Sequence, residues 1–279
     1  MLRFKSPLLW ASALLLSGHQ ILAAQTPSTT IPRPSHVVIV VEENHSYSEI
    51  INSPQAPFIN TLASEGALFT SSYAVAHPSQ PNYLALFSGS TQGITNDTCP
   101  HTFGGSNLAH QLLAANKTFR GYSEGLPSAG SKVCVSGEYV RKHAPWTDFS
   151  DLPSAVNQPL TSFPTNYANL PAVSFVIPDL LNDMHDGTIQ QADSWLQAKL
   201  LGYVHWAKTN NSLLIITWDE DDASSSNHVP TIFVGPMIKP GKYGQKITHY
   251  NVLRTLEAMY GLGYLGHAST VLTITNVWQ

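Results

Sequence analysis

The chain has 279 residues, with 14 Lys and Arg, 18 Asp and Glu, and a formal net charge of -4. This length is sufficient for one large α/β domain with a sizeable core. Charged residues make up only 11% of the chain, which argues against a nucleic acid or an anionic membrane as partner, because both attract a basic surface. The 12 His residues leave many imidazoles for metal binding or proton transfer.

The N-terminus has the pattern of an export signal. Arg3 and Lys5 precede the apolar stretch Leu8–Leu16, and Ile21–Ala24 offers small residues for cleavage. We expect a signal peptide over residues 1–24, an irregular lead-in over 25–34, and one domain over 35–279. No later apolar segment reaches the length of a membrane span. The sequence therefore predicts a secreted or periplasmic protein without stable membrane association.

Export also bears on the two cysteines, Cys99 and Cys134. In an oxidising compartment we expect them to form a disulfide, the alternative being two free thiols.

The first candidate strand is the near-continuous apolar run His36–Val41, which is typical of a central parallel strand. Glu42, Glu43, Asn44 and His45 follow it directly. In open α/β sheets, ligands bind at the carboxyl ends of the strands. These polar side chains are therefore candidates for a functional site.

The next elements are a helix over Ala56–Ser64 and a strand over Ala67–Ala76. Pro81 then fits the first turn of a helix that runs to Gly89, with Ser79 just ahead of it. A hydroxyl there lies beside free backbone N–H groups and the positive end of the helix dipole, which suits an anionic substrate such as phosphate. The local sequence alone favours a plain N-cap for Ser79.

Residues 96–171 are the least regular part of the chain. A helix is expected over Leu108–Asn116 and a strand over Phe119–Tyr122, while Gly, Pro, Ser and Asn dominate residues 124–169. This composition predicts loops and short elements that cover the active site. The residues there that could touch substrate, although a surface position is the simpler interpretation for each, are Lys142, His143 and Trp146.

Two further buried strands end in ligand-type side chains. Ala172–Ile177 leads into a segment with Asp179, Asp183 and His185, and the strand that begins at Ser212 leads into Asp219–Asp222. Adjacent carboxylates repel one another strongly when partly desolvated, and a divalent cation relieves this repulsion. His228 follows this loop, and His is the commonest nitrogen ligand of metal ions in proteins. A solvated acidic loop is the alternative for this loop considered alone.

Helices are expected over Ile189–Lys208 and Thr248–Tyr260, and a strand over Thr231–Val234. Strands and helices thus alternate along the chain. This alternation predicts an α/β fold with a mostly parallel central sheet and helices on both faces.

Residues 56–89, APFINTLASEGALFTSSYAVAHPSQPNYLALFSG, resemble the nucleophile region of the alkaline phosphatase superfamily. The closer resemblance is to the phosphoesterase family of acid phosphatases and phospholipases C, through EENHSY, HPSQPNY, PDLLNDMHD and WDEDD followed by NHVP. It implies an alkaline-phosphatase-like fold. Sulfatases have an Arg four residues after the position of Ser79, and this chain has Tyr83 there, which disfavours a sulfatase.

The resemblance also implies roles for the candidate residues. Ser79 would attack phosphorus and form a phosphoserine that water hydrolyses. The expected ligands of the nearest metal are Glu43, Asn44, Asp219 and Glu220. The expected ligands of a second metal, should that position be filled, are Asp179, Asp183 and His228. The residues expected to contact phosphate or the leaving group are Asn44, His77, Asn82 and His185, with His185 also the candidate proton donor.

The ligand types suit one or two divalent ions, and they leave Zn²⁺, Mn²⁺, Mg²⁺ and Ca²⁺ open. Three functions remain: a secreted acid phosphatase that acts on a small phosphorylated substrate, a phosphodiesterase of the phospholipase C type, and a non-enzymatic cation- or carbohydrate-binding module. The short chain, without a separate lipid-binding module, favours the first. If His77 or His185 must be protonated, activity should be highest below neutral pH.

Overall fold

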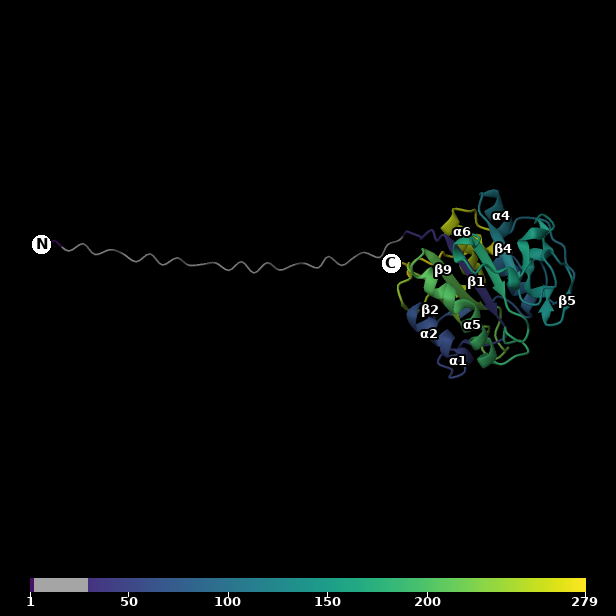
Figure 1. Cartoon of the computed structure of the whole chain (residues 1–279), viewed down its shortest axis with the longest axis horizontal. Coiled ribbons are helices and arrows are strands. Elements are labelled where there is room, and N and C mark those ends of the chain that lie inside the picture. Colours follow the sequence, from purple (N-terminus) through teal and green to yellow (C-terminus); the bar gives the residue numbers. More distant parts are fainter. Residues whose placement is uncertain (3–29) are drawn as a thin grey trace.

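The computed structural model describes residues 1–2 and 30–279, so nearly all of the expected signal peptide lies outside the described residues. The described elements form a central sheet with helices packed around it (Figure 1). None of the helices in these two ranges is long and apolar enough to cross a membrane.

Within the described residues, the central sheet has eight strands. In spatial order they are β11 (Gly241–Tyr243), β2 (Ala67–Phe69), β10 (Thr231–Val234), β9 (Ser212–Trp218), β1 (His36–Glu42), β8 (Val173–Ile177), β4 (Phe119–Ser123) and β7 (Asn157–Pro159). All neighbouring pairs are parallel except those of β10, which is antiparallel to both β9 and β2. The prediction of a mostly parallel sheet is confirmed.

The alternation of side chains along β1 shows why its sequence is apolar throughout. Val37, Ile39 and Val41 pack into one core, and Val38 and Val40 pack into the other. Helices α3 (Ser79–Ser88), α4 (Leu108–Ala114) and α6 (His249–Tyr260) cover the first face, and α2 (Pro57–Glu65) and α5 (Ile189–Ala207) cover the second. Helices therefore lie on both faces, as predicted.

The remaining elements are short. They comprise the helix α1 (Tyr47–Ile50), the paired strands β3 (Ser72–Tyr73) and β12 (Ile247–Thr248), the hairpin β5 (Val135–Ser136) and β6 (Tyr139–Val140), and the 3-10 turns η1 (Arg141–His143), η2 (Pro145–Asp148), η3 (Ser154–Val156), η4 (Leu160–Ser162), η5 (Tyr167–Asn169) and η6 (Gly266–Thr270).

Two expected elements differ from the structure. The strand expected over Ala67–Ala76 is two short strands, β2 and β3, which belong to different sheets. The helix expected to begin near Pro81 begins at Ser79, with Pro78 as its N-cap residue, so Ser79 lies in the first turn and makes no capping bond. The favoured interpretation of Ser79 as a plain cap is therefore wrong.

The irregular region is fastened to the rest of the molecule by the expected disulfide. Cys99 and Cys134 are bonded, with 5.9 Å between their Cα atoms. This bond ties the segment after α3 to the hairpin that leads into η1. Asp97, two residues before Cys99, accepts from the N–H of Gln80 in the first turn of α3, so the disulfide also holds η1 near that turn.

Candidate active site

The candidate site lies at the carboxyl end of the sheet, where β1 and β9 end side by side. Glu42 and Trp218 are register partners, and the backbone N–H of Asp219 donates to Glu42 O at 2.9 Å. Glu43 and Asp219 therefore leave the sheet together. The left-handed backbone of Asn44 (φ 52°) turns the chain here, a conformation that Asn tolerates better than most residues, and its N–H donates to Asp219 Oδ1 at 3.2 Å.

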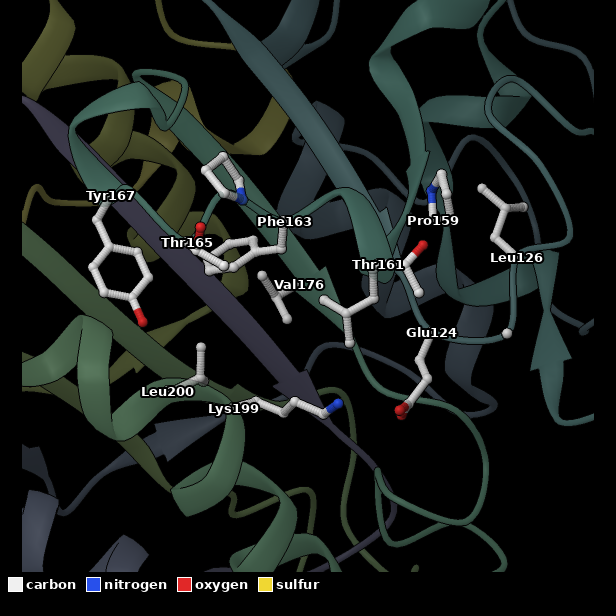
Figure 2. A pocket seen from close by; sticks show the side chains of 13 residues that line it. Glu124, Leu126, Pro159, Thr161, Phe163, Thr165, Tyr167, Val176, Lys199 and Leu200 are labelled. Atoms are coloured by element: carbon white, nitrogen blue, oxygen red, sulfur yellow. The ribbon is translucent and has the colours of Figure 1, made fainter.

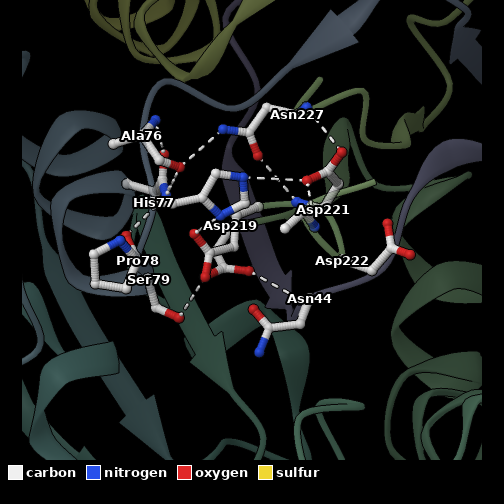
Figure 3. Close-up of polar contacts among 12 residues, drawn as sticks. Asn44, Ala76, His77, Pro78, Ser79, Asp219, Asp221, Asp222 and Asn227 are labelled. Carbon is white, nitrogen blue, oxygen red and sulfur yellow. Dashed lines mark hydrogen bonds and ion pairs between the residues drawn. The ribbon is translucent and has the colours of Figure 1, made fainter. Parts of the chain in front are cut away.

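Ser79 faces this pair of strand ends from α3. Its side chain is buried, at 1% exposure, and its Oγ donates to Glu43 Oε2 at 3.0 Å and lies 3.4 Å from Glu220 Oε1. Figure 3 shows Ser79, Asn44 and His77 around Asp219. The structure thus brings Ser79 together with the residues that the sequence suggested as its metal ligands.

Several buried oxygen atoms at this point have no hydrogen-bond partner among the described residues. They include Asn44 Oδ1 and Asp219 Oδ2. A buried polar atom left unpaired is costly, and carboxylate and amide oxygens are the ligands that hard divalent cations take. The set Glu43, Asn44, Asp219 and Glu220 therefore fits a divalent metal next to the Ser79 hydroxyl.

A second group of ligand-type atoms adjoins the first. One atom each from Glu43, His143 and Asp183 lies within 4.8 Å of the others, and all three residues are buried. His143 Nε2 is 3.2 Å from Glu43 Oε1, and His143 Nδ1 is 3.5 Å from Asp183 Oδ2. Burial lowers the pKa of His143 well below its usual value, which favours the neutral form that binds metals.

His143 corrects the sequence interpretation, which favoured a surface position. Its ring stacks on Tyr83 at 4.8 Å between centroids, and the Tyr83 hydroxyl donates to Glu43. No strand end or helical pattern marks His143, because it lies in the short turn η1. Only long-range packing brings it to the carboxylates.

His228 is not brought to this cluster, which corrects its expected role as a metal ligand. Its Nε2 lies 3.1 Å from Thr70 O, and its ring stacks on Tyr47 and Tyr73, with centroids 4.7 Å and 5.1 Å away. The turn before β10 pairs His228 with Tyr73 in an isolated bridge. The imidazole of His228 thus contacts a backbone carbonyl and two aromatic rings, and not the carboxylates of the site.

Asp179 and Asp183, expected as a pair, separate in the structure. Asp183 joins His143 and Glu43, whereas Asp179 Oδ1 accepts from the N–H of Asn182 at 3.1 Å and lies outside the three-residue group. Asp179 therefore shapes the turn that delivers Asp183.

Asn82 also departs from its expected role in substrate binding. Its Oδ1 accepts from the N–H groups of Val75 and Ala76, each at 3.0 Å, and its Nδ2 donates to Ala76 O at 2.9 Å. The side-chain amide is therefore committed to the loop that precedes Ser79. Asn82 positions this loop and does not face a substrate.

His77 and His185 lie at the partly exposed edge of the site. His77 Nδ1 is 2.7 Å from Glu220 Oε2, and its Nε2 is 3.2 Å from Asp221 Oδ1, with 40% of the side chain exposed. His185 Nδ1 is 2.7 Å from Asp186 Oδ1, with 30% of the side chain exposed. Both imidazoles are therefore accessible to solvent and to a substrate bound at this edge.

A cation lies close to the first turn of α3, which carries Ser79. Lys142 Nζ is 2.8 Å from Asp97 Oδ2, and Asp97 Oδ1 accepts from the N–H of Gln80 at 2.9 Å. Burial lowers the pKa of Lys142, but the hydrogen bond to Asp97 and the charges of Glu43, Asp97 and Asp219 raise it above its usual value on balance. Lys142 is therefore a fixed positive charge. The sequence analysis had favoured a surface position without a role in the site for this residue.

The carboxylates of the site are held in a poorly solvated place. Burial, together with the charges of neighbouring carboxylates, raises the pKa of Asp219 and of Glu220 to about 7 and that of Asp183 to about 8. Burial likewise raises the pKa of Glu43 well above its usual value. Such a cluster favours a bound positive charge.

Comparison with known proteins decides the family. A family model described as the Phosphoesterase family matches residues 51–263. The chain belongs to the phosphoesterase family. It is therefore a hydrolase that acts on phosphate esters.

Two relatives of this phosphoesterase are phosphatases by name. The phosphatidylinositol-3-phosphatase of Mycobacterium tuberculosis is 53% identical, with 90% of this chain and 85% of the relative covered. An acid phosphatase of Aspergillus fumigatus is 33% identical, with 91% of this chain and 66% of the relative covered.

The fold is that of the alkaline phosphatase superfamily. A superfamily protein from Vibrio parahaemolyticus has a TM-score of 0.59 at 14% identity, with 88% of this chain and 72% of that chain covered.

Proposed function

We propose that this phosphoesterase is a secreted, metal-dependent phosphomonoesterase of the acid phosphatase type that acts through a phosphoserine. The observation that carries the proposal is the buried Ser79 hydroxyl, which points at Glu43 and Glu220 beside unpartnered oxygens of Asn44 and Asp219. A structural serine at a helix start would cap the helix, and Ser79 does not.

Ser79 Oγ attacks phosphorus, the bond from phosphorus to the ester oxygen breaks, and the product alcohol leaves. The Oγ proton passes to a carboxylate that Oγ already faces, either Glu43 at 3.0 Å or Glu220 at 3.4 Å. His185, at the partly exposed edge, supplies a proton to the leaving oxygen. Water then attacks the phosphoserine, which releases inorganic phosphate and restores Ser79.

The residues that would hold a metal are Glu43, Asn44, Asp219 and Glu220, and those that would hold a second one are Glu43, His143 and Asp183. A divalent ion in these positions would stabilise the negative charge that develops on Ser79 Oγ and on the phosphoryl oxygens. This second set replaces the expected His228 and Asp179 with His143 and Glu43.

The phosphoryl group also needs protein donors. Asp97 now joins Lys142 Nζ to the N–H of Gln80, the residue after the nucleophile. Its carboxylate thus lies where the start of a helix favours an anion. A substrate phosphate that displaces it would gain both the ammonium and the backbone donor.

Both relatives' names support a monoester of phosphate as the substrate class. The disulfide between Cys99 and Cys134 supports export to an oxidising compartment. Acid phosphatase activity implies an optimum below neutral pH.

The test is hydrolysis of an aryl phosphate across pH by wild type, chelator-treated protein and Ser79→Ala. We expect chelation to abolish the activity, metal to restore it, and Ser79→Ala to lower kcat by at least about a thousandfold. Wild type quenched in acid during turnover should carry phosphate on Ser79. Near-full activity of Ser79→Ala would overturn the nucleophile, and hydrolysis of phosphatidylcholine but of no monoester would point to a phospholipase C.

A further inference from the structure

A cavity of about 360 Å³ lies on the α5 side of the sheet (Figure 2), and Ser79 is not among the residues that line it. Its walls come from the segments after β4 and β7, from β8 and from the middle of α5. Most of the wall is apolar, including Leu126, Phe163, Val176 and Leu200. A cavity of this size and lining is typical of small-molecule sites.

The cavity is joined to the active site by Glu124, which lines its end. Glu124 Oε2 accepts from Asn182 Nδ2 at 3.0 Å and lies 3.3 Å from the N–H of Asp179. Asn182 directly precedes Asp183, whose carboxylate lies with His143 and Glu43. The wall of the cavity and the turn that carries Asp183 are therefore one hydrogen-bonded unit.

The polar side of the cavity holds an uncommitted cation. Lys199 makes no ion pair or side-chain hydrogen bond with any residue in the described parts of the chain, and Figure 2 shows its side chain extending toward Glu124. The far side is formed by Phe163 and Tyr167. The cavity thus offers polar groups at the end next to the Asp179–Asp183 turn and hydrocarbon walls beyond it.

The cavity is polar at the end next to the active site and apolar beyond it. This arrangement matches an amphiphilic ester whose phosphate lies in the active site and whose hydrocarbon part lies in the cavity. We propose that the cavity binds the hydrocarbon chain of the substrate's alcohol, while the phosphate lies at Ser79. In this arrangement, the hydrocarbon chain of the substrate crosses the turn of Asp179 and Asn182, passes Lys199 and ends against Phe163 and Leu200. The inference rests on the proposed phosphomonoesterase and adds its substrate class: phosphate esters of alcohols with an alkyl or acyl chain.

The test uses a homologous series, from ethyl to octyl phosphate, each below its micelle concentration. For wild type, kcat/KM should rise with each added methylene, by up to about fourfold where the methylene is fully buried. Thr161 and Thr165 are exposed side chains on the wall. Thr161→Trp or Thr165→Trp should fill the cavity and flatten this dependence, leaving kcat/KM for ethyl phosphate unchanged.

Thr275→Trp is the matched control, because Thr275 is exposed and lies outside the cavity, and it should keep the wild-type dependence. Thermal unfolding of all variants reports whether each is folded. Equal kcat/KM for ethyl and octyl phosphate, or an unchanged dependence in both cavity variants, would overturn the cavity proposal alone. Hydrolysis of an aryl phosphate but of no member of the series would also overturn the cavity proposal alone, whereas hydrolysis of neither would overturn the phosphomonoesterase itself.

Discussion

Lys142 Nζ lies 2.8 Å from Asp97 Oδ2 in a partly buried pair beside the first turn of α3. The second oxygen of Asp97 binds the N–H of Gln80. The pair therefore connects the turn η1 to the first turn of α3. It places a positive charge where the phosphoryl group of a substrate is expected.

We expect Lys142→Met to lower kcat/KM for an aryl phosphate by about 10- to 100-fold, because a hydrogen bond to a charged group contributes about 1.5–3 kcal/mol. Lys142→Arg should recover part of this loss. Lys117→Met removes an exposed lysine elsewhere and should leave the kinetics unchanged. A loss in Lys142→Met no larger than in Lys117→Met would show that Lys142 does not contact the substrate.

The two histidines that exchanged roles between sequence and structure provide a test of metal binding. His143→Asn should lower the metal retained after dialysis, because His143 is one of three buried ligand-type residues. His228→Asn should retain the wild-type amount, because His228 bonds to Thr70 O and stacks on tyrosines. Elemental analysis of both variants measures this difference, and the reverse result would restore the original assignment of His228.

The disulfide should matter for both stability and substrate binding. A sequence separation of 35 residues corresponds to about 4 kcal/mol in the chain-entropy model. The double variant Cys99→Ser with Cys134→Ser should therefore melt roughly 10 °C lower. KM should also rise, since the bond holds the Asp97 segment against the hairpin that leads to Lys142. Calorimetry and steady-state kinetics measure the two effects, and an unchanged KM would show that η1 is positioned without the disulfide.

Glu257 in α6 should make stability depend on pH. Burial raises its pKa to about 8, and the hydrogen bond from the N–H of Leu265 and the charge of Arg254 lower it only partly. The folded pKa thus exceeds the unfolded value of about 4.3. The folded state therefore keeps a proton that the unfolded chain releases, so stability falls as pH rises from the unfolded pKa through the folded one.

Urea unfolding of Glu257→Gln checks this effect, because Gln does not titrate. Between about pH 5 and about pH 8, the free energy of unfolding should fall less in the variant than in wild type. Equal changes in the two proteins would mean that Glu257 is ionised in the folded state over the whole range.

The central sheet and the acidic half of the site could be predicted from the sequence alone. The apolar runs before Glu43, Asp183 and Asp219 are buried on both faces of the sheet. Each run therefore forms a central strand, independently of the conformation of the loops. The ends of parallel strands meet at one edge, and these carboxylates were therefore predictable as a group. Ser79 was predictable as a candidate for the same local reason, from its position at a helix start.

The rest of the site depends on long-range packing that no local sequence pattern shows. His143, Lys142 and Asp97 lie in irregular segments, where no periodic pattern fixes the direction of a side chain, and long-range contacts place them. Asn82 and His228 have suitable side chains in suitable motifs, yet backbone groups of neighbouring loops take up their hydrogen bonds. The residue type tells which hydrogen bonds a side chain can make, but the loops that pack against it decide which of them it makes.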